Sequence, residues 1–200
     1  MAERGDSAEY ALEEDEVPRA LGACIDLEER IIIKVPLYLG LRVGELAHMK
    51  AEWLISNGEL RIPPVQSCNC AECRRFRGGE WRPKTEAGIR TLAIPRPVLS
   101  DLQEYLARKP QGLETSRVTL NLKTKAILKR AGIKRKGLAK EAPFPHALRA
   151  TCATRLAGAG IDSAALSYIM GWASIRVADH YIRVSRARAL AAQQIRRIFG

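Results

Sequence analysis

The sequence predicts a mainly helical α+β protein, and three observations support this fold class. Apolar residues recur at helical spacing through most of the 200 residues, which favours amphipathic helices packed around one core. Residues 53–62 read as two short strands joined by Asn57 and Gly58, a pair that favours a tight hairpin turn. A further strand is expected at residues 90–94, where the side chains alternate between two faces.

The charge of the chain indicates a polyanionic partner. The sequence holds 33 Lys and Arg against 22 Asp and Glu, so its formal net charge is +11 and its isoelectric point is near 9.8. This balance is typical of nucleic-acid-binding proteins, although on composition alone a merely soluble basic protein fits nearly as well. The arrangement of charge favours nucleic acid, because residues 3–16 are strongly acidic and leave the remainder more basic than the total.

The first 18 residues form an acidic segment that is poor in large apolar side chains. We expect this segment to be a mobile tail, so that the folded domain covers residues 19–200. The chain start lacks the apolar core of a signal peptide, and charged residues interrupt the longest apolar run. We therefore expect a cytoplasmic protein without a membrane span, near the nucleoid or inside a host cell, with its five cysteines reduced.

Helical segments are expected on both sides of the predicted strands. Residues 18–41 have helical apolar spacing, and we expect Pro36 to kink or divide this helix and Gly40 to end it. A short helix over residues 42–49 then precedes the hairpin and turns Leu46 toward the core. Later helices are expected at residues 97–107, 119–131, from 145 onward, and 184–199.

Two pairs of residues at helical spacing point to chemistry on an anionic group. His146 and Arg149 lie three residues apart, so both face the same side of the expected helix. A histidine and an arginine that converge suit an anionic oxygen, since both donate hydrogen bonds and the guanidinium is always charged. Arg42 and Glu45 have the same spacing, which an ordinary surface ion pair would explain equally well.

The stretch around His146 and Arg149 resembles the second conserved box of the tyrosine recombinases (phage integrase family). That motif is His-x-x-Arg, then Gly-His or Gly-Trp, then a nucleophilic Tyr, and Trp172 and Tyr181 take the later positions here. The intervals match as well, because Trp172 lies 23 residues after Arg149 and Tyr181 nine residues after Trp172. The four positions together identify the stretch far better than a His-x-x-Arg alone.

Two upstream stretches resemble other conserved parts of the same family. Residues 40–45 resemble the first box, Gly-Leu-Arg-x-x-Glu, in which Arg42 is catalytic and Glu45 holds it in position. Residues 84–95 resemble a Lys-Thr-x-x-x-x-Arg-x-x-x-Ile-Pro hairpin whose lysine, here Lys84, reaches the cleavage site. Without this resemblance, a lysine beside a turn is more often solvated than catalytic. The resemblance extends over about residues 20–197.

The resemblance implies a tyrosine recombinase catalytic domain, mainly α with a small three-stranded antiparallel sheet from residues 53–94. It implies cleavage and rejoining of double-stranded DNA through a 3′-phosphotyrosyl intermediate, for the integration or excision of a virus, plasmid or mobile element. Tyr181 would be the nucleophile and Lys84 the general acid, while Arg42, His146, Arg149 and Trp172 stabilise the transition state. The arginines take the role of a metal ion, so this chemistry needs no cofactor.

The resemblance also carries expectations about assembly. Family members act as tetramers on DNA and often pass their last helix to a neighbour, so residues 184–199 are expected to mediate self-association; alternatively they cap their own domain. The N-terminal DNA-clamping domain of the family is expected to be absent from this chain. Two other functions stay open, namely a type IB topoisomerase-like activity and a catalytically silent DNA-binding regulator.

Residues 65–82 combine cysteines with arginines. Cys68, Cys70 and Cys73 would supply most of a zinc site, with His48 or Cys24 as a fourth ligand, or they form a loop with free thiols. If the cysteines bind zinc, a zinc-dependent transcription factor is a further possible function. Contacts to DNA phosphates are expected from basic residues here and in a later run, namely Arg74, Arg75, Arg77, Arg82, Lys134, Arg135 and Lys136.

Overall fold

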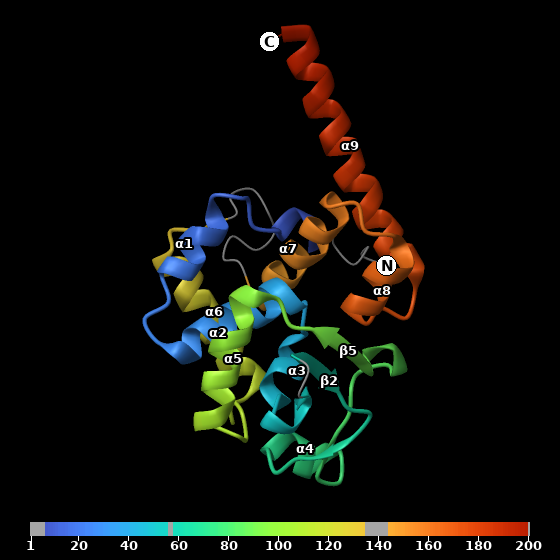
Figure 1. Ribbon diagram of the computed structural model, residues 1–200. Helices are drawn as coiled ribbons and strands as arrows, with labels where there is room; N and C mark the ends of the chain where they lie inside the picture. The colour runs from blue at the N-terminus through green and yellow to red at the C-terminus, as the bar shows by residue number, and fades with distance from the viewer. Residues whose placement is uncertain (1–6, 56–57, 135–143, 200) are drawn as a thin grey trace.

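Helices dominate the computed structural model, which describes residues 7–55, 58–134 and 144–199 (Figure 1). Helix α2 (Leu27–Leu39) runs through the core and packs against three others, α5 (Arg96–Arg108), α6 (Arg117–Arg130) and α7 (Pro145–Gly158). Its consecutive Ile31, Ile32 and Ile33 are fully buried, as expected for a helix that has neighbours on every side. The predicted mainly helical fold class is confirmed.

Local sequence signals set both ends of α2. The Asp26 carboxylate accepts a hydrogen bond from the Glu29 backbone N–H at 2.7 Å and so caps the first turn. Gly40 ends the helix in the left-handed conformation, with φ at 62°. The helix continues through Pro36, so of the two expected effects, a kink or a division, the division does not occur. The division from α1 (Glu16–Gly22) falls instead at residues 23–26, where Asp26 supplies the cap.

The acidic N-terminal segment is folded from residue 7 onward, which corrects the expectation of a mobile tail for residues 7–18. A 3₁₀ helix, η1 (Ser7–Tyr10), packs against α7, and Ala8, Ala11 and Leu12 are buried. The Leu12 backbone N–H also donates a hydrogen bond to the Thr151 hydroxyl at 2.7 Å. These few small side chains stand between acidic residues, so they produce no visible period in the sequence.

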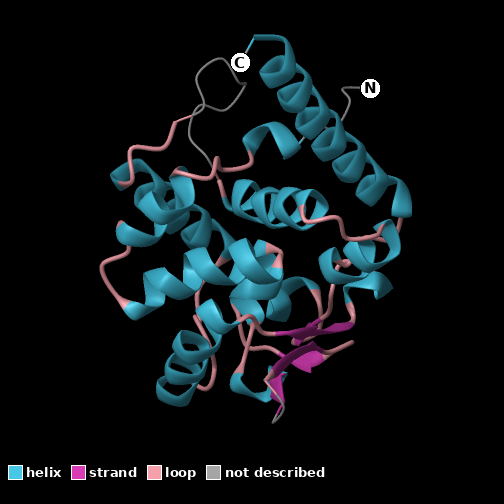
Figure 2. Cartoon of the chain, turned by 45° about the horizontal axis from the view of Figure 1, so that its top comes forward, coloured by secondary structure: helices cyan, strands magenta, loops and turns pink. Residues whose placement is uncertain are grey.

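The predicted three-stranded antiparallel sheet is present, in the order β1–β2–β5. It consists of β1 (Leu54–Ile55), β2 (Glu59–Ile62) and β5 (Arg90–Ala93), with 3₁₀ turns η2 (Ala51–Trp53) and η3 (Glu86–Gly88) before β1 and β5. Leu60 pairs with both Leu54 and Leu92, and Leu60 and Leu92 are buried, so one face of the sheet joins the core. Figure 2 shows the strands gathered at one end of the helical body.

Between β2 and β5 lies a segment of residues 66–81, called here the cysteine segment, whose elements were not predicted. Its ends pair as β3 (Gln66–Ser67) and β4 (Glu80–Trp81), and α4 (Ala71–Phe76) lies between them. The Trp81 ring packs between Trp53 and His48, with ring centroids 5.2 Å and 5.3 Å away. The cysteine segment is therefore anchored on α3 (Val43–His48) and on the start of the sheet.

The C-terminal part adds α8 (Ser163–Met170) and α9 (Ile175–Phe199), which pack with α7 around a second apolar cluster. Helix α9 is continuous over 25 residues, so the helix expected at residues 184–199 is its outer part. It projects away from the body in Figure 1, and its side chains are exposed from residue 186 onward. Among the described residues, no helix has both the length and the apolar character that crossing a membrane requires.

Candidate functional site

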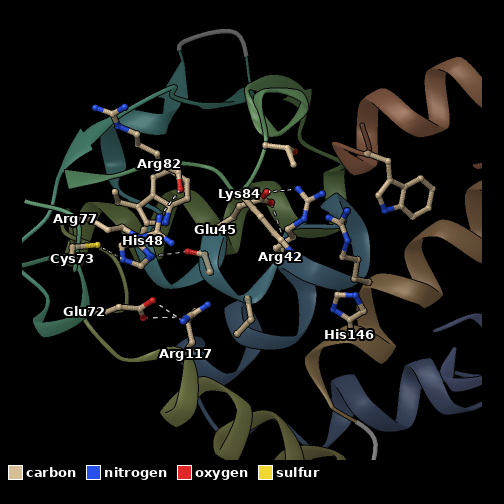
Figure 3. Close-up of a pocket in the computed structure, with 16 residues that line it drawn as sticks. Arg42, Glu45, His48, Glu72, Cys73, Arg77, Arg82, Lys84, Arg117 and His146 are labelled. Carbon is tan, nitrogen blue, oxygen red and sulfur yellow. Dashed lines mark hydrogen bonds and ion pairs between the residues drawn. The ribbon is translucent and has the colours of Figure 1, made fainter. Parts of the chain in front are cut away.

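A cavity of about 710 Å³ gathers residues from widely separated parts of the chain (Figure 3). Five of the six predicted catalytic residues line it, namely Arg42, Lys84, His146, Arg149 and Trp172. Additional charged or ionisable side chains on the wall are His48, Glu72, Arg77, Arg82 and Arg117. The cavity is therefore strongly cationic, which suits an anionic ligand.

Arg42 lies at the start of α3, and Glu45 holds it there. The Arg42 backbone N–H donates to Glu45 Oε2 at 2.9 Å, and its Nη1 donates to Oε1 at 2.8 Å. Glu45 therefore caps the N-terminus of α3, as a glutamate three residues after the N-cap position commonly does. The predicted pair is therefore present, and Arg42 keeps a fixed orientation toward the cavity.

Glu45 also binds Arg90, which lies 45 residues further along the chain. Arg90 Nη2 donates to Glu45 Oε2 at 3.1 Å, and Arg90 Nη1 donates to Oε1 at 3.3 Å. The Arg90 side chain is fully buried and donates a further bond to the Gly88 carbonyl. Burial alone would raise the pKa of the Glu45 carboxyl, but Arg90, Arg149 and Arg42 hold that pKa below its usual value. Glu45 is thus a charged, almost completely buried bridge between two guanidinium groups.

Arg149 lies inside α7 and is buried. Its Nη1 donates to the Gly40 carbonyl and its Nη2 to the Met170 carbonyl. Burial, and then repulsion from Arg42, lower the pKa of Arg149 to about 9, which leaves the guanidinium charged at neutral pH. Arg149 is therefore a fixed cation at the base of the cavity.

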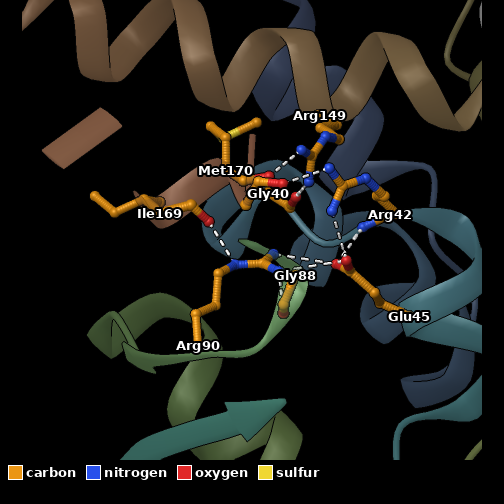
Figure 4. Close-up of polar contacts among 9 residues, drawn as sticks. Gly40, Arg42, Glu45, Gly88, Arg90, Arg149, Ile169 and Met170 are labelled. Atoms are coloured by element: carbon orange, nitrogen blue, oxygen red, sulfur yellow. Dashed lines mark hydrogen bonds and ion pairs between the residues drawn. The ribbon is translucent and has the colours of Figure 1, made fainter. Parts of the chain in front are cut away.

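The C-terminus of α8 binds three arginines of the site, Arg42, Arg90 and Arg149 (Figure 4). Three consecutive carbonyls at this end each accept a hydrogen bond from a different arginine: Ile169 from Arg90, Met170 from Arg149, and Gly171 from Arg42. The last carbonyls of a helix lack intrahelical partners and carry partial negative charge, so they suit cationic donors. The sequence contained no signal for this arrangement, because the three arginines lie far apart in the chain.

Gly171 makes this convergence possible. Its φ of 59° is in the left-handed region that glycine favours. A Cβ at this position would lie only 2.7 Å from Arg90 Nη1 and 3.1 Å from Arg42 Nη1. Gly171 therefore meets both a backbone requirement and a space requirement.

Lys84 and His146 are the exposed members of the site. Lys84 precedes η3 on the segment that leads into β5, and His146 is the second residue of α7. Both side chains line the cavity, so they can contact a ligand that enters from solvent. His146 and Arg149 share one side of α7, as their spacing predicts.

Tyr181 lies one side chain behind the cavity wall. Its ring stacks on Trp172, with centroids 5.3 Å apart and planes 22° apart, and it is 6% exposed. Trp172 in turn lines the cavity, with the Arg149 guanidinium 5.9 Å from its ring centroid. The structure thus places the predicted nucleophile next to the site, packed in the second apolar cluster.

The basic residues expected to contact DNA fall into separate groups. Arg77 and Arg82 line the cavity, whereas Arg74 and Arg75 are exposed on α4. Lys134 is exposed after α6, while residues 135 and 136 (Arg135 and Lys136) lie outside the described residues. Arg117 was not predicted; it begins α6, lines the cavity and pairs with Glu72 at 2.6 Å.

His48 and Cys73 on the cavity wall belong to the one cluster of metal-ligating side chains found among the described residues. His48, Cys68, Cys70 and Cys73 bring their ligand atoms within 4.8 Å of one another. Of the two fourth ligands considered from the sequence, the structure therefore places His48 with the three cysteines. Cys24 lies elsewhere, with its Sγ 3.5 Å from the Ala20 carbonyl.

The arrangement suits a tetrahedral or trigonal-bipyramidal phosphorus centre with several anionic oxygens. Arg42 and Arg149 are fixed by carbonyls and by Glu45, so they offer charge without reorganising. Lys84 and His146 add proton donors at the solvent side.

Known proteins are similar to this chain in sequence and in fold. Tyrosine recombinase XerA of Pyrococcus furiosus is 27% identical over 173 residues, which are 80% of this chain and 51% of that protein. The chain thus spans about half the length of that curated relative. The solved Tn1549 transposon integrase in complex with circular intermediate DNA gives a TM-score of 0.67 at 21% identity, covering 96% of this chain and 69% of that one.

The catalytic domain of bacteriophage HP1 integrase gives a TM-score of 0.58 at 17% identity, covering 92% of this chain and 93% of that one. These likenesses show that the fold is that of a tyrosine recombinase catalytic domain. The family model described as Phage integrase family matches residues 11–188, a range that includes every residue of the cavity wall and Tyr181. The chain therefore belongs to the phage integrase family.

Proposed function

We propose that this chain is the catalytic part of a site-specific DNA recombinase that forms a 3′-phosphotyrosyl intermediate through Tyr181. The observation that carries the proposal is the cavity, which unites two fixed guanidiniums with Lys84, His146 and Trp172 beside that tyrosine. The basic net charge supports double-stranded DNA as the substrate, as does the DNA bound by the Tn1549 integrase. Integration or excision of a virus, plasmid or mobile element is the proposed task.

The proposed reaction exchanges one phosphoester bond for another. The Tyr181 phenol loses its proton to His146 or to water and its oxygen attacks the phosphorus. The bond to the 5′-oxygen breaks, and Lys84 gives that oxygen a proton. Arg42 and Arg149 stabilise the negative charge that spreads over the other oxygens, and His146 assists at the same phosphate. The reverse reaction, with a 5′-hydroxyl as nucleophile, rejoins the strand without an external energy source.

The stack on Trp172 gives this reaction an additional step. Tyr181 is buried behind the cavity wall, so it has to leave Trp172 before its oxygen reaches a phosphate in the cavity. Once there, the nearby guanidiniums favour the phenolate, because an opposite charge stabilises the ionised form of an acid. Self-association through the outer part of α9, giving a tetramer on DNA, is part of the same proposal.

Covalent trapping on a nicked duplex tests the proposal. The nick releases the short 5′-hydroxyl product, so an attached protein cannot rejoin the strand, and an adduct is expected with the wild-type chain at low salt. Tyr181→Phe should form none, whereas Tyr168→Phe should match wild type, since Tyr168 is an exposed tyrosine that binds the backbone of Thr91. An adduct in Tyr181→Phe, or tight DNA binding that never becomes covalent, would contradict the proposal.

A four-way DNA junction separates recombination from topoisomerase-like strand passage. A recombinase is expected to resolve the junction into two duplexes. Relaxation of supercoiled DNA without junction resolution would favour the topoisomerase-like function instead.

A further inference from the structure

The cysteine segment and α3 bring three thiols and one imidazole to a single point. His48 Nε2 lies 3.5 Å from Cys73 Sγ and 3.6 Å from Cys70 Sγ. Cys68 completes the group, and all four ligand atoms lie within 4.8 Å of one another. Figure 3 shows His48 and Cys73 facing each other on the wall of the cavity.

These separations are those of ligands around one tetrahedral ion. Zinc binds sulfur at about 2.3 Å and imidazole nitrogen at about 2.1 Å, so tetrahedral sulfur and nitrogen ligands are about 3.6 Å apart. An S–H···N hydrogen bond would join Nε2 to one sulfur, whereas here two sulfurs are at nearly equal distance. A shared ion at the centre explains the geometry better than a pairwise contact.

Backbone groups orient the ligands from outside the cluster. His48 Nδ1 lies 2.7 Å from the Gly44 carbonyl, and because that oxygen only accepts, Nδ1 carries the proton. The lone pair is then on Nε2, the nitrogen that faces the sulfurs. The Cys73 backbone N–H lies 3.4 Å from Cys70 Sγ, and the Cys70 N–H lies 3.5 Å from Cys68 Sγ. These two contacts fix the positions of the sulfur atoms from outside the cluster.

We propose that His48, Cys68, Cys70 and Cys73 bind one structural Zn²⁺ that fastens the cysteine segment to α3. Three thiolates and one imidazole fill a tetrahedral shell, which leaves no open position for catalysis and is typical of a structural zinc site. Soft sulfur ligands favour zinc over magnesium or calcium, and the close approach of all four atoms fits a single ion.

The site has a consequence for the cavity beside it. His48 ends α3, whose first turn holds Arg42 and Glu45, and the cysteine segment leads into Arg82. A Zn²⁺ would fix Arg77 and Arg82, on the cysteine segment and just beyond it, relative to Arg42 across the same cavity. The metal would therefore set the spacing between catalytic and DNA-contacting cations and would take no part in bond breaking.

Metal content of the full chain tests the proposal without any substitution. After purification under reducing conditions and removal of any histidine tag, we expect inductively coupled plasma mass spectrometry to find one zinc per chain. Chain refolded with Co²⁺ should show sulfur-to-cobalt charge-transfer absorption and the strong visible bands of four-coordinate cobalt. A folded chain with all five thiols free that binds neither supplied Zn²⁺ nor Co²⁺ would overturn the proposal.

Cys70→Ser and Cys24→Ser provide a matched pair of variants. Cys70 is exposed, so its substitution removes a ligand with little effect on packing, while Cys24 lies outside the cluster. In competition with a coloured chelator, Cys70→Ser is expected to bind Zn²⁺ at least about tenfold more weakly, with Cys24→Ser unchanged. Cys70→His should retain the metal, because imidazole replaces thiolate as a ligand. Equal zinc affinity in wild type, Cys70→Ser and Cys24→Ser would overturn the ligand assignment.

Discussion

Glu45 shows how a single residue reconciles three close positive charges. Arg42, Arg90 and Arg149 would repel one another, and the burial of Arg90 and Arg149 strengthens that repulsion. The buried carboxylate binds two of them, and backbone carbonyls accept from all three. The arrangement holds the cations in position before any substrate binds, which is how an electrostatic catalyst avoids reorganisation during the reaction.

Gly171→Ala is predicted to disturb this arrangement through space as well as through backbone strain. The new Cβ would require Arg90 and Arg42 to move, because it would lie 2.7 Å and 3.1 Å from their Nη1 atoms. We expect a loss of about 3 kcal/mol or more in unfolding free energy and at least about a tenfold loss in adduct formation. Denaturant unfolding and covalent trapping measure the two effects.

Gly160→Ala is the control for that prediction. Gly160 also has a positive φ, 87°, but open space surrounds the place where its Cβ would lie. Gly160→Ala should lower the unfolding free energy only by the cost of a left-handed alanine backbone, about 1–2 kcal/mol. The folded variant should form the adduct normally. Equal effects of the two substitutions would show that the guanidiniums tolerate the added methyl group.

The sequence predicted the residues of the site better than the contacts that hold them. Arg42 with Glu45 and His146 with Arg149 follow from helical spacing, and the structure has both pairs on α3 and α7. The second partner of Glu45 is Arg90, 45 residues away, and no local period reveals such a contact. The carbonyls at the end of α8 are backbone groups, so residue identity carried no information about their role.

At the scale of elements, α9 combines a buried base with an exposed outer part. Leu190 and Ile198 are 58% and 63% exposed, so replacing both by Ser should change unfolding free energy by less than about 1 kcal/mol. If the outer part mediates self-association, this double variant should lose complexes of several copies on DNA while it still binds DNA as one copy. Analytical ultracentrifugation with a labelled duplex measures the difference.

Val118→Ser with Leu122→Ser is the matched control on α6. These side chains are 71% and 63% exposed, so the change in exposed apolar surface is similar. This variant should keep the assembly of wild type. Loss of assembly in both variants would indicate general solvation effects and argue against a specific role of α9.

Short elements explain most of what the sequence analysis missed. Strands β3 and β4 have two residues each, which is too short to show alternation, and Trp81 of β4 packs against Trp53, which is distant in the sequence. The N-terminal 3₁₀ helix has only four residues and is held by α7. By contrast, the longer helices α2, α5 and α6 were predicted, and α2 and α5 show the helical period of apolar residues.

For the whole molecule, Glu28 joins three helices of the core. From α2 it accepts hydrogen bonds from Lys109 at 2.8 Å, Lys123 at 2.6 Å and Tyr105 at 3.1 Å. Burial alone would raise the pKa of the carboxyl, but the lysines lower it from 4.5 to about 2. Its stabilising effect is therefore complete above pH 4.5 and is lost as pH falls toward 2.

Glu28→Gln is predicted to flatten the acid side of the stability profile. At neutral pH the variant should be less stable by about 1 kcal/mol, a value reduced for the solvent that reaches these lysines. The difference from wild type should shrink between pH 4.5 and 2. Glu104→Gln, which removes an exposed pair with Arg108, serves as the control for denaturant unfolding at each pH. Parallel profiles of wild type and Glu28→Gln would contradict the prediction.

The projecting helix α9 is continuous, and Tyr181 lies near its buried end. From Tyr181 to Phe199 there are 18 residues (199 − 181), or about 27 Å at the helical rise. If the helix tilts as one body about its buried part, a shift of the free end by several ångströms would move the phenol of Tyr181 by a much smaller distance. In the proposed mechanism, a partner that binds the far end of α9 would therefore influence when Tyr181 leaves its stack on Trp172.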